Sequence, residues 1–256
     1  MIHLQRASAA GAGASARVVA ATPTPGTPET AAVRAMFDRI APRYDLLNRL
    51  LSAGTDVRWR RQAVDLLQLP PPVRVLDLCC GTADLLIEAL RRHPGSAGLG
   101  VDLSTAMLRR GATKLARGGL GGRARLAAAD AVRLPLRDGS VDAALAAFGV
   151  RNVGDPLAAM REVRRVLRPG GRFVVLEFSM PGGLLGAAYR LYFRGLLPRL
   201  GGLLSDRSAY AYLPASVECF ATPAQLAEWM ERAGFSAVRW TPLTGGIACL
   251  HRGERR

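Results

Sequence analysis

The chain has almost no lysine. Only Lys114 is a lysine among the 35 lysine and arginine residues, and these outnumber the 20 aspartates and glutamates, which gives a net charge of +15. A basic surface attracts polyanions such as nucleic acids and anionic lipids, although a coding bias toward arginine accounts for part of the excess. The sign of the charge alone does not choose between these partners.

Long apolar runs and metal-ligand spacings are also missing. The nearest approach to a transmembrane segment, residues 182–205, is interrupted by three arginines and a proline. There are four cysteines, Cys79, Cys80, Cys219 and Cys249. Cys79 and Cys80 are adjacent in an apolar strand, with no CxxC pairing and no neighbouring histidine, so neither a zinc site nor a disulfide framework is expected. We therefore expect a cytoplasmic protein, with peripheral contact at the inner face of the membrane at most.

Residues 1–28 contain no acidic residue and consist mainly of Ala, Gly, Ser, Thr and Pro. This composition is typical of a disordered tail. An organellar targeting segment has a similar composition, and a bacterial tail is the interpretation that we favour. Residues 29–256 are then expected to form a single domain, for which their number is sufficient.

From residue 73 onward, short apolar runs of β type alternate with segments of helical periodicity. Strands are expected at 73–80, 97–103, 123–130, 140–148, 172–179, 237–243 and 246–253. Helices are expected at 82–93, 104–118, 155–167 and 222–235. This order predicts an α/β fold of Rossmann-like type, with a mostly parallel seven-stranded sheet, helices on both faces and an antiparallel edge hairpin.

The first strand lacks the GxGxxG loop that cradles the pyrophosphate of a dinucleotide. Instead Asp77 lies near its end, Gly81 makes a tight turn, and Thr82 opens the following helix. A carboxylate repels pyrophosphate but suits a cation, and a glycine lets the backbone pass close to a ligand. These residues predict a site for S-adenosylmethionine, which carries an ammonium and a sulfonium.

Asp102 and Asp130 end the next two strands. An acid at the end of the second strand can accept hydrogen bonds from both hydroxyls of a ribose. Asp130 is expected to accept from an adenine amino group, beside a backbone contact from Ala131. Each acid alone is more often a solvated loop residue. Because ligands of open α/β sheets bind beyond the carboxyl ends of the strands, the three acids together predict one adenosylmethionine site.

Two longer stretches resemble a known family. YDLLNRLLSAGTDVRW (44–59) and RVLRPGGRFVVLEFS (165–179) are similar to the two signatures of the ubiquinone/menaquinone C-methyltransferases, and the likeness runs from about Val33 to Gly253. It implies a class I methyltransferase fold. Ala83 departs from the glycine that is usual in the cofactor loop, and it is expected to fit if its φ is negative.

The resemblance implies methylation of a ring carbon of demethylmenaquinol, a quinol with a prenyl tail. A ubiquinone precursor or another prenylated phenol is the alternative acceptor. A nucleic-acid methyltransferase or binding protein is the alternative from another class, but the chain has no NPPY base-flipping motif and its charge is scattered. We therefore expect no nucleic-acid partner, and a homodimer stays open.

The stretch AAFGVRN (146–152) carries a charge and an amide to the tip of an apolar strand. In such a fold Arg151 and Asn152 would face the acceptor. Arg151 is expected to stabilise the phenolate that develops, and Asn152 to orient it. Because arginine stays protonated, a water held by Arg151 or by Tyr44 is the expected proton acceptor.

Two segments outside the strand order complete the expected domain. Helices at about 30–69, with Phe37, Tyr44 and Trp59, are expected to form an N-terminal cap over the cofactor, although Trp59 alone is more typical of a core. The insert at about 180–215 is either a packing helix pair or a lid over the prenyl chain.

Overall fold

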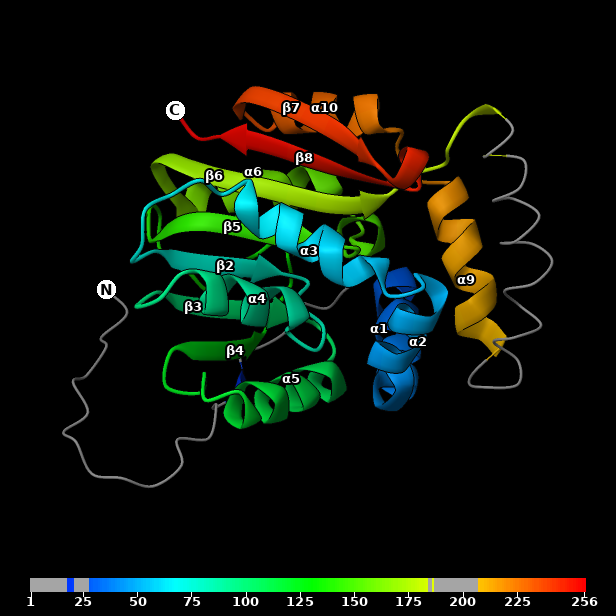
Figure 1. Ribbon diagram of the computed structural model, residues 1–256, viewed down its shortest axis with the longest axis horizontal. Coiled ribbons are helices and arrows are strands. Elements are labelled where there is room, and N and C mark those ends of the chain that lie inside the picture. The colour runs from blue at the N-terminus through cyan, green and yellow to red at the C-terminus, as the bar shows by residue number, and fades with distance from the viewer. Residues whose placement is uncertain (1–17, 21–27, 184–185, 187–206) are drawn as a thin grey trace.

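The computed structural model describes residues 18–20, 28–183, 186 and 207–256. One sheet holds eight strands in the order β1-β4-β3-β2-β5-β6-β8-β7 (Figure 1). The strand bounds are Val18–Ala20 (β1), Arg74–Leu78 (β2), Ala97–Asp102 (β3), Ala124–Ala128 (β4), Val141–Ala147 (β5), Leu167–Phe178 (β6), Ser236–Leu243 (β7) and Ala248–Glu254 (β8). β1 to β6 pair in parallel, whereas β8 is antiparallel to both of its neighbours, β6 and β7.

This architecture confirms the expected fold class and adds one strand. β7 and β8 form the antiparallel pair that closes one edge. At the other edge β1 pairs with β4, from Val18 opposite Leu126 to Ala20 opposite Ala128, although these residues belong to the segment that was expected to be a tail. Two consecutive valines favour a strand, and the exposed edge of β4 supplies the partner. The rest of that segment, 1–17 and 21–27, lies outside the described residues.

Helices cover both faces of the sheet (Figure 1). On one face lie α3 (Thr55–Asp65), α4 (Asp84–Arg92) and α5 (Thr105–Arg117); on the other lie α6 (Pro156–Val166) and α10 (Pro223–Arg232). The expected start signals of three helices are present. Ser104 accepts a hydrogen bond from the amide of Met107, Asp155 accepts one from that of Ala158, and Thr222 forms a capping box at α10.

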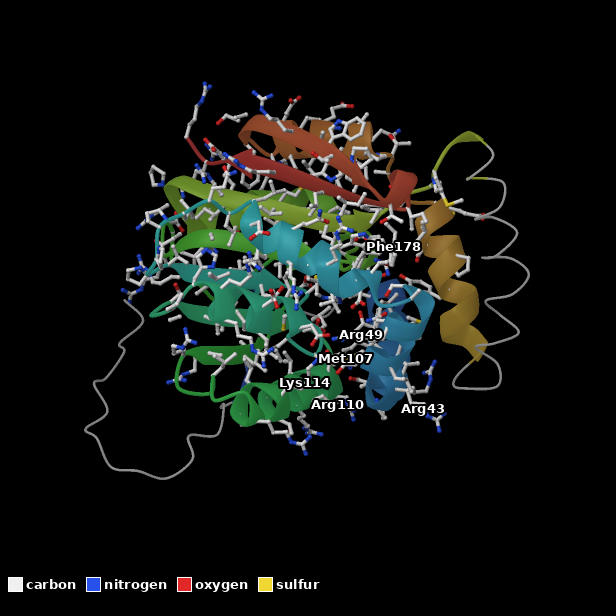
Figure 2. The ribbon with its side chains drawn as sticks, viewed as in Figure 1. Arg43, Arg49, Met107, Arg110, Lys114 and Phe178 are labelled. Atoms are coloured by element: carbon white, nitrogen blue, oxygen red, sulfur yellow. The ribbon has the colours of Figure 1, made fainter. Side chains whose placement is uncertain are left out.

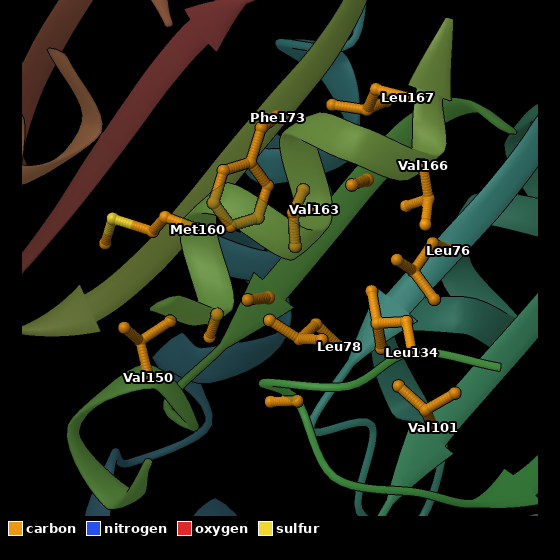
Figure 3. Close-up of a cluster of buried hydrophobic side chains, with 14 of the residues drawn as sticks. Leu76, Leu78, Val101, Leu134, Val150, Met160, Val163, Val166, Leu167 and Phe173 are labelled. Carbon is orange, nitrogen blue, oxygen red and sulfur yellow. The ribbon is translucent and has the colours of Figure 1, made fainter. Parts of the chain in front are cut away.

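The hydrophobic core follows from the two-residue alternation of the strands. Along β2, Val75 faces the cluster under α3 and α4, whereas Leu76 and Leu78 face the cluster under α6 and α10. Figure 3 shows Leu76 and Leu78 near Val163 of α6, and all three are at most 1% exposed. Burying such a side chain stabilises the fold by about 1.5–3 kcal/mol, so the core fixes the strand ends rigidly.

Three segments near the carboxyl ends of the strands complete the described part. α1 (Pro28–Ile40), η1 (Ala41–Arg43) and α2 (Tyr44–Leu51) form what we call the cap. η2 (Val150–Asn152) follows β5, α9 (Arg207–Glu218) lies beside it, and η4 (Thr244–Gly246) joins β7 to β8. Most of the insert at about 180–215, expected to be either a packing helix pair or a lid, lies outside the described residues, which omit 184–185 and 187–206. Across the described ranges, no helix combines the length and apolarity that crossing a bilayer requires.

Candidate active site

A cavity of about 420 Å³ lies between the cap and the carboxyl ends of the parallel strands. β2 pairs with β3 on one side and with β5 on the other, so the strand order reverses at this point, where open α/β sheets bind ligands. The described lining comprises the cap (Thr30, Val33, Arg34, Phe37, Tyr44), the turn after β2 (Cys79, Gly81), the β3–α5 connection (Val101–Ser104, Met107), the segment 129–132 and the segments 147–149 and 152–155. The volume is within the range of small-ligand sites.

Asp102 holds the floor of this cavity in shape. Its Oδ2 accepts a hydrogen bond from the amide of Gly81 at 2.8 Å, and its Oδ1 accepts one from the amide of Ser104 at 2.8 Å. A carboxylate has about four acceptor positions, so two stay available to a ligand such as a ribose. Burial raises the pKa of Asp102, and a cationic ligand in the cavity would favour the ionised form.

Asp130 and Ala131 also line the cavity, as the sequence predicted. Oδ1 of Asp130 accepts a hydrogen bond from the amide of Val132 at 3.1 Å, which turns the chain after β4. The carboxylate retains acceptor capacity for an amino group. Gly81 faces the same space with a φ of +53°, a conformation in which glycine avoids the strain of a side chain.

Asp77 does not reach the cavity, contrary to the expected convergence of three acids. It is 1% exposed, and its Oδ2 accepts a hydrogen bond from the amide of Leu86 at 3.0 Å. Burial raises its pKa to about 8. The geometry therefore gives Asp77 a positioning role, since it fixes the first turn of α4 behind the Gly81 turn.

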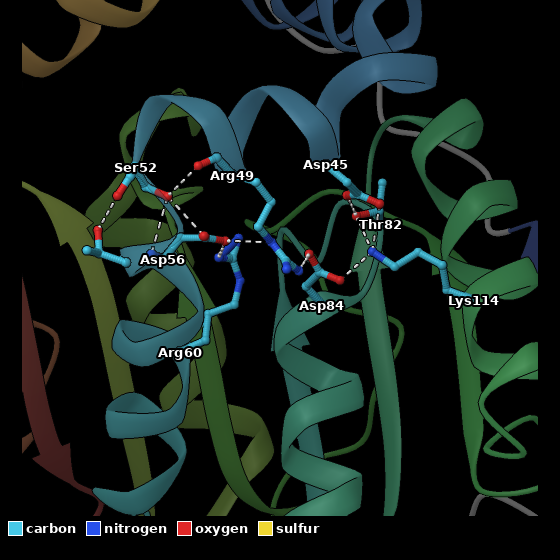
Figure 4. A network of polar contacts seen from close by, with 9 residues as sticks. Asp45, Arg49, Ser52, Asp56, Arg60, Thr82, Asp84 and Lys114 are labelled. Atoms are coloured by element: carbon cyan, nitrogen blue, oxygen red, sulfur yellow. Dashed lines mark hydrogen bonds and ion pairs between the residues drawn. The ribbon is translucent and has the colours of Figure 1, made fainter.

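Thr82 likewise turns away from the cavity. Its hydroxyl donates to Oδ1 of Asp45 at 2.6 Å and accepts a hydrogen bond from Nζ of Lys114 at 3.1 Å (Figure 4). Thr82 is buried and is not among the described lining residues. Its side chain contacts Asp45 of the cap instead.

Ala83 has a positive φ, contrary to expectation. Its φ is 65° and its ψ is 24°, which is the left-handed region where a side chain costs about 1–2 kcal/mol. The methyl group fits because Gly111 of α5 lies against it: a Cβ on Gly111 would lie 3.2 Å from that of Ala83. The packing of α5 on this turn therefore compensates for the strain.

Arg151 is bound within the protein. Its Nη1 donates to Oε1 of Glu177 and to the carbonyl oxygen of Phe148, both at 2.5 Å, and the side chains of Arg151 and Glu177 are 6% and 2% exposed. Arg151 is not among the described residues that line the cavity. The structure thus differs from the expected free cation, because the carboxylate of Glu177 neutralises the guanidinium. A direct contact of Arg151 with the acceptor stays a prediction.

Asn152 does line the cavity, beside Gly149. Its Nδ2 donates to the carbonyl oxygen of Phe148 at 3.3 Å, and its Oδ1 accepts a hydrogen bond from the hydroxyl of Tyr212 at 2.9 Å. Gly149 must lack a side chain here, since a Cβ on it would lie 2.4 Å from that of Cys79. The tip of β5 is therefore held by β2 on one side and by α9 on the other.

Tyr44 lines the opposite side of the cavity, from the cap. Its ring meets that of Phe37 edge to face, with centroids 6.1 Å apart. Burial raises the pKa of Tyr44, so the phenol is neutral and can donate a hydrogen bond. Trp59, by contrast, is 3% exposed and belongs to the core, where its indole donates to Oγ1 of Thr244.

Two important residues were missed in the sequence. Glu177 is a lone acid within an apolar strand, and a buried charge needs a partner, so its position was itself a signal. Lys114 stood out as the single lysine, but its partners were not visible in the sequence because they are far apart in the chain. Within the described part of the chain, no cluster of three or more His, Cys, Asp and Glu side chains could hold a metal ion.

Comparison with known proteins decides the family. The profile of the ubiE/COQ5 methyltransferase family matches residues 26–255. The chain belongs to this family. A demethylmenaquinone methyltransferase of Thermus thermophilus is 51% identical over 222 residues, which cover 86% of this chain and 100% of that protein. A ubiquinone/menaquinone biosynthesis C-methyltransferase of Syntrophotalea carbinolica is 50% identical over 223 residues, or 87% and 93% of the two chains.

The fold agrees with this family. A crystal structure of an S-adenosylmethionine-dependent methyltransferase from Thermotoga maritima, described as a possible histamine N-methyltransferase, superposes with a TM-score of 0.60 at 20% identity. The superposition covers 88% of this chain and 100% of the Thermotoga maritima chain. Asp56 of α3 is buried and forms an ion pair with Arg60 at 2.9 Å.

Proposed function

We propose that this methyltransferase of the ubiE/COQ5 family transfers a methyl group from S-adenosylmethionine to a ring carbon of demethylmenaquinol. The observation that carries the proposal is one cavity lined by Asp102, Asp130 and Asn152 from the strand ends and by Tyr44 from the cap. A prenylated quinol is thereby the substrate, and the product is menaquinol.

The residues that line the cavity fit the methyl donor. Asp102 retains acceptor positions for ribose hydroxyls, and Asp130 can accept from the adenine amino group. Gly81, which has no side chain, lets the ligand lie against the turn after β2. Bound here, adenosylmethionine supplies an electrophilic methyl group on a positively charged sulfur.

The acceptor side needs groups that handle a phenol. Losing its proton, with an intrinsic pKa of about 10, puts negative charge on the ring carbon next to the oxygen. That carbon would take the methyl group as the methyl–sulfur bond of the donor breaks and releases S-adenosylhomocysteine, and the ring proton then leaves to water. Asn152 and Tyr44 reach the cavity and can donate hydrogen bonds to the oxygen or to a water beside it. Arg151 supports them indirectly, because it anchors the Phe148 carbonyl that Asn152 also contacts.

Transfer of label from adenosylmethionine tests the proposal. The purified chain is incubated with methyl-labelled donor and either demethylmenaquinol or total RNA. Label is expected in the quinol and none in the RNA, and Asp102→Asn is expected to lower the transfer. Label in RNA alone would contradict the proposal.

The ubiquinone precursor is the second candidate acceptor, because one of the similar proteins carries both pathways in its name. A competition assay with demethylmenaquinol and a demethylated ubiquinol of equal tail length separates the two. Equal kcat/KM values would extend the proposal to both rings, and a preference for the benzoquinol would replace it.

We also propose that the chain meets its lipid substrate at the membrane surface through the cap. Leu46 of α2 is 56% exposed, and its neighbours Arg43 and Arg49 are exposed on the same cap (Figure 2). An apolar residue among cations suits an anionic lipid surface. The wild-type chain is expected to co-sediment with vesicles that contain phosphatidylglycerol, and Leu46→Ser is expected to lower the bound fraction.

Homodimerisation stays a prediction, which analytical ultracentrifugation tests.

A further inference from the structure

The single lysine of the chain lies where the cap meets the cofactor loop. Lys114 is on α5, and its Nζ donates to Oδ2 of Asp45 at 2.9 Å, to Oγ1 of Thr82 at 3.1 Å and to Oδ1 of Asp84 (Figure 4). The three oxygens belong to α2, to the turn after β2 and to the start of α4. Figure 2 places Lys114 where α5 meets the cap.

The contacts of Lys114 fit an ammonium and not a guanidinium. An ammonium has three donors that diverge from one atom, and here each meets one oxygen. A guanidinium spreads its five N–H donors over a flat fork, which suits paired oxygens in one plane. All of the other 34 basic residues counted among the 35 lysines and arginines are arginine. The arrangement of the three oxygens explains why a lysine is found at this one position.

Two of the three partners of Lys114 are next to residues that line the cavity. Asp45 follows Tyr44 of the cap, and Thr82 follows Gly81 of the cofactor loop. Thr82 also donates directly to Asp45, which completes a ring of hydrogen bonds. Although burial would raise it, the hydrogen bonds from Thr82 and Lys114 hold the pKa of Asp45 below its usual value.

We infer that Lys114 is a positioning residue that fastens the cap to the cofactor loop and so holds Tyr44 and Gly81 on either side of the methyl donor. The inference rests on the proposed function, because it assumes that the donor binds between these two residues. Without the ammonium, the carboxylates of Asp45 and Asp84 repel each other and push α2 away from the turn. The cap remains attached at another point, where Asp38 of α1 accepts a hydrogen bond from the Ser104 hydroxyl at 2.6 Å.

Donor affinity of the purified chain, measured by titration calorimetry, tests the inference. Lys114→Met is expected to raise the Kd for adenosylmethionine about 10-fold or more. Lys114→Arg is expected to restore little of the affinity. Lys114→Met combined with Asp45→Asn is expected to bind more tightly than Lys114→Met alone, because the uncompensated carboxylate is gone. Arg117→Met, an exposed position one turn further along α5, is the matched control and is expected to keep the wild-type Kd.

The outcomes separate the inference from the proposed function. If the wild-type chain does not bind the donor, the proposed function fails and the inference with it. If the wild-type chain binds and Lys114→Met has the same Kd while its thermal midpoint falls, Lys114 is only structural and the inference alone is overturned. A wild-type Kd in Lys114→Arg would overturn the geometric part of the argument.

Discussion

The cavity has two walls, and their charges are held in different ways. On the core wall, formed by the ends of the strands, Arg151 and Glu177 pair with side chains that are 6% and 2% exposed. On the cap wall, Lys114 and Asp45 pair with side chains that are 27% and 30% exposed. Both pairs join elements that are distant in sequence, but only the pair of Arg151 and Glu177 is almost fully buried.

This difference sets how strongly each wall depends on its pair. Removing one partner of a buried ion pair costs about 3–5 kcal/mol, because the other charge is left without compensation. A pair that is partly open to solvent is worth less than a buried one, closer to the roughly 0–1 kcal/mol of a surface pair. The core wall is therefore part of the folded framework, whereas the cap wall is held by contacts weak enough for a ligand to strengthen.

The largest expected effect is on the core wall. Arg151→Met is expected to lower the free energy of unfolding by about 3–5 kcal/mol and to abolish most turnover, while donor affinity is retained. The double variant Arg151→Met, Glu177→Met is expected to recover most of the stability but not the turnover. Urea denaturation measures the free energy of unfolding, transfer of label measures turnover, and calorimetry measures donor affinity. A loss below about 1 kcal/mol in the single variant would contradict the contrast between the walls.

The second effect concerns the buried Asp77 of the same wall. Its pKa is about 8 in the folded chain against 3.8 without burial, so between these values the folded state binds a proton that the unfolded state has lost. Stability from this group is therefore present at low pH and falls as the pH rises toward 8, by up to about 1.4 kcal/mol per pH unit. Asp77→Asn is expected to remove this slope in urea denaturation between pH 5 and 8. The exposed Asp138→Asn is the control that should keep it.

A third, smaller effect distinguishes the acid that faces the cavity. Asp102→Asn removes the negative charge and replaces one of the two oxygens that accept from the amides of Gly81 and Ser104, and hydrogen bonds to a charged group are worth about 1.5–3 kcal/mol. We expect the Kd for adenosylmethionine to rise about 10- to 100-fold in calorimetry. An unchanged Kd would mean that the donor lies elsewhere in the cavity.

The smallest effect is expected on the cap wall. Asp38 accepts hydrogen bonds from the hydroxyl of Ser104 and the amide of Ala106 at the start of α5. Asp38→Ala is expected to cost about 1 kcal/mol of unfolding free energy, as the loss of a helix cap does. A loss of about 3 kcal/mol or more of unfolding free energy in thermal or urea denaturation would mean that the cap wall depends on its polar contacts as strongly as the core wall does.

Local patterns in the sequence predicted most of the framework. Alternating apolar strands and capped helices predicted the parallel sheet and its edge pair, because strand and helix periodicities are local properties. Asp102, Asp130 and Ala131 were predicted at the cavity, since the carboxyl ends of parallel strands share one edge. β1 was missed, because three residues with one pairing partner leave little local signal.

Three polar side chains do not line the described cavity, for one common reason. Asp77, Thr82 and Arg151 are polar residues at or near strand ends, and their positions alone suggest contact with a ligand. The structure directs their side chains to Leu86, Asp45 and Glu177 instead. Which way a polar side chain turns depends on partners from distant parts of the chain, and these are not visible in local sequence.

The sequence by itself determined the order of the strands and helices, the family signatures and the edge of the sheet at which a ligand binds. Only the tertiary structure decided which charged side chains line the cavity and which form ion pairs within the protein. The physical reason is that periodicity and capping act over a few residues, whereas a buried charge is stable only beside a partner brought to it by the fold. Glu177 is such a partner for Arg151, and the oxygens of Asp45, Thr82 and Asp84 are such partners for Lys114.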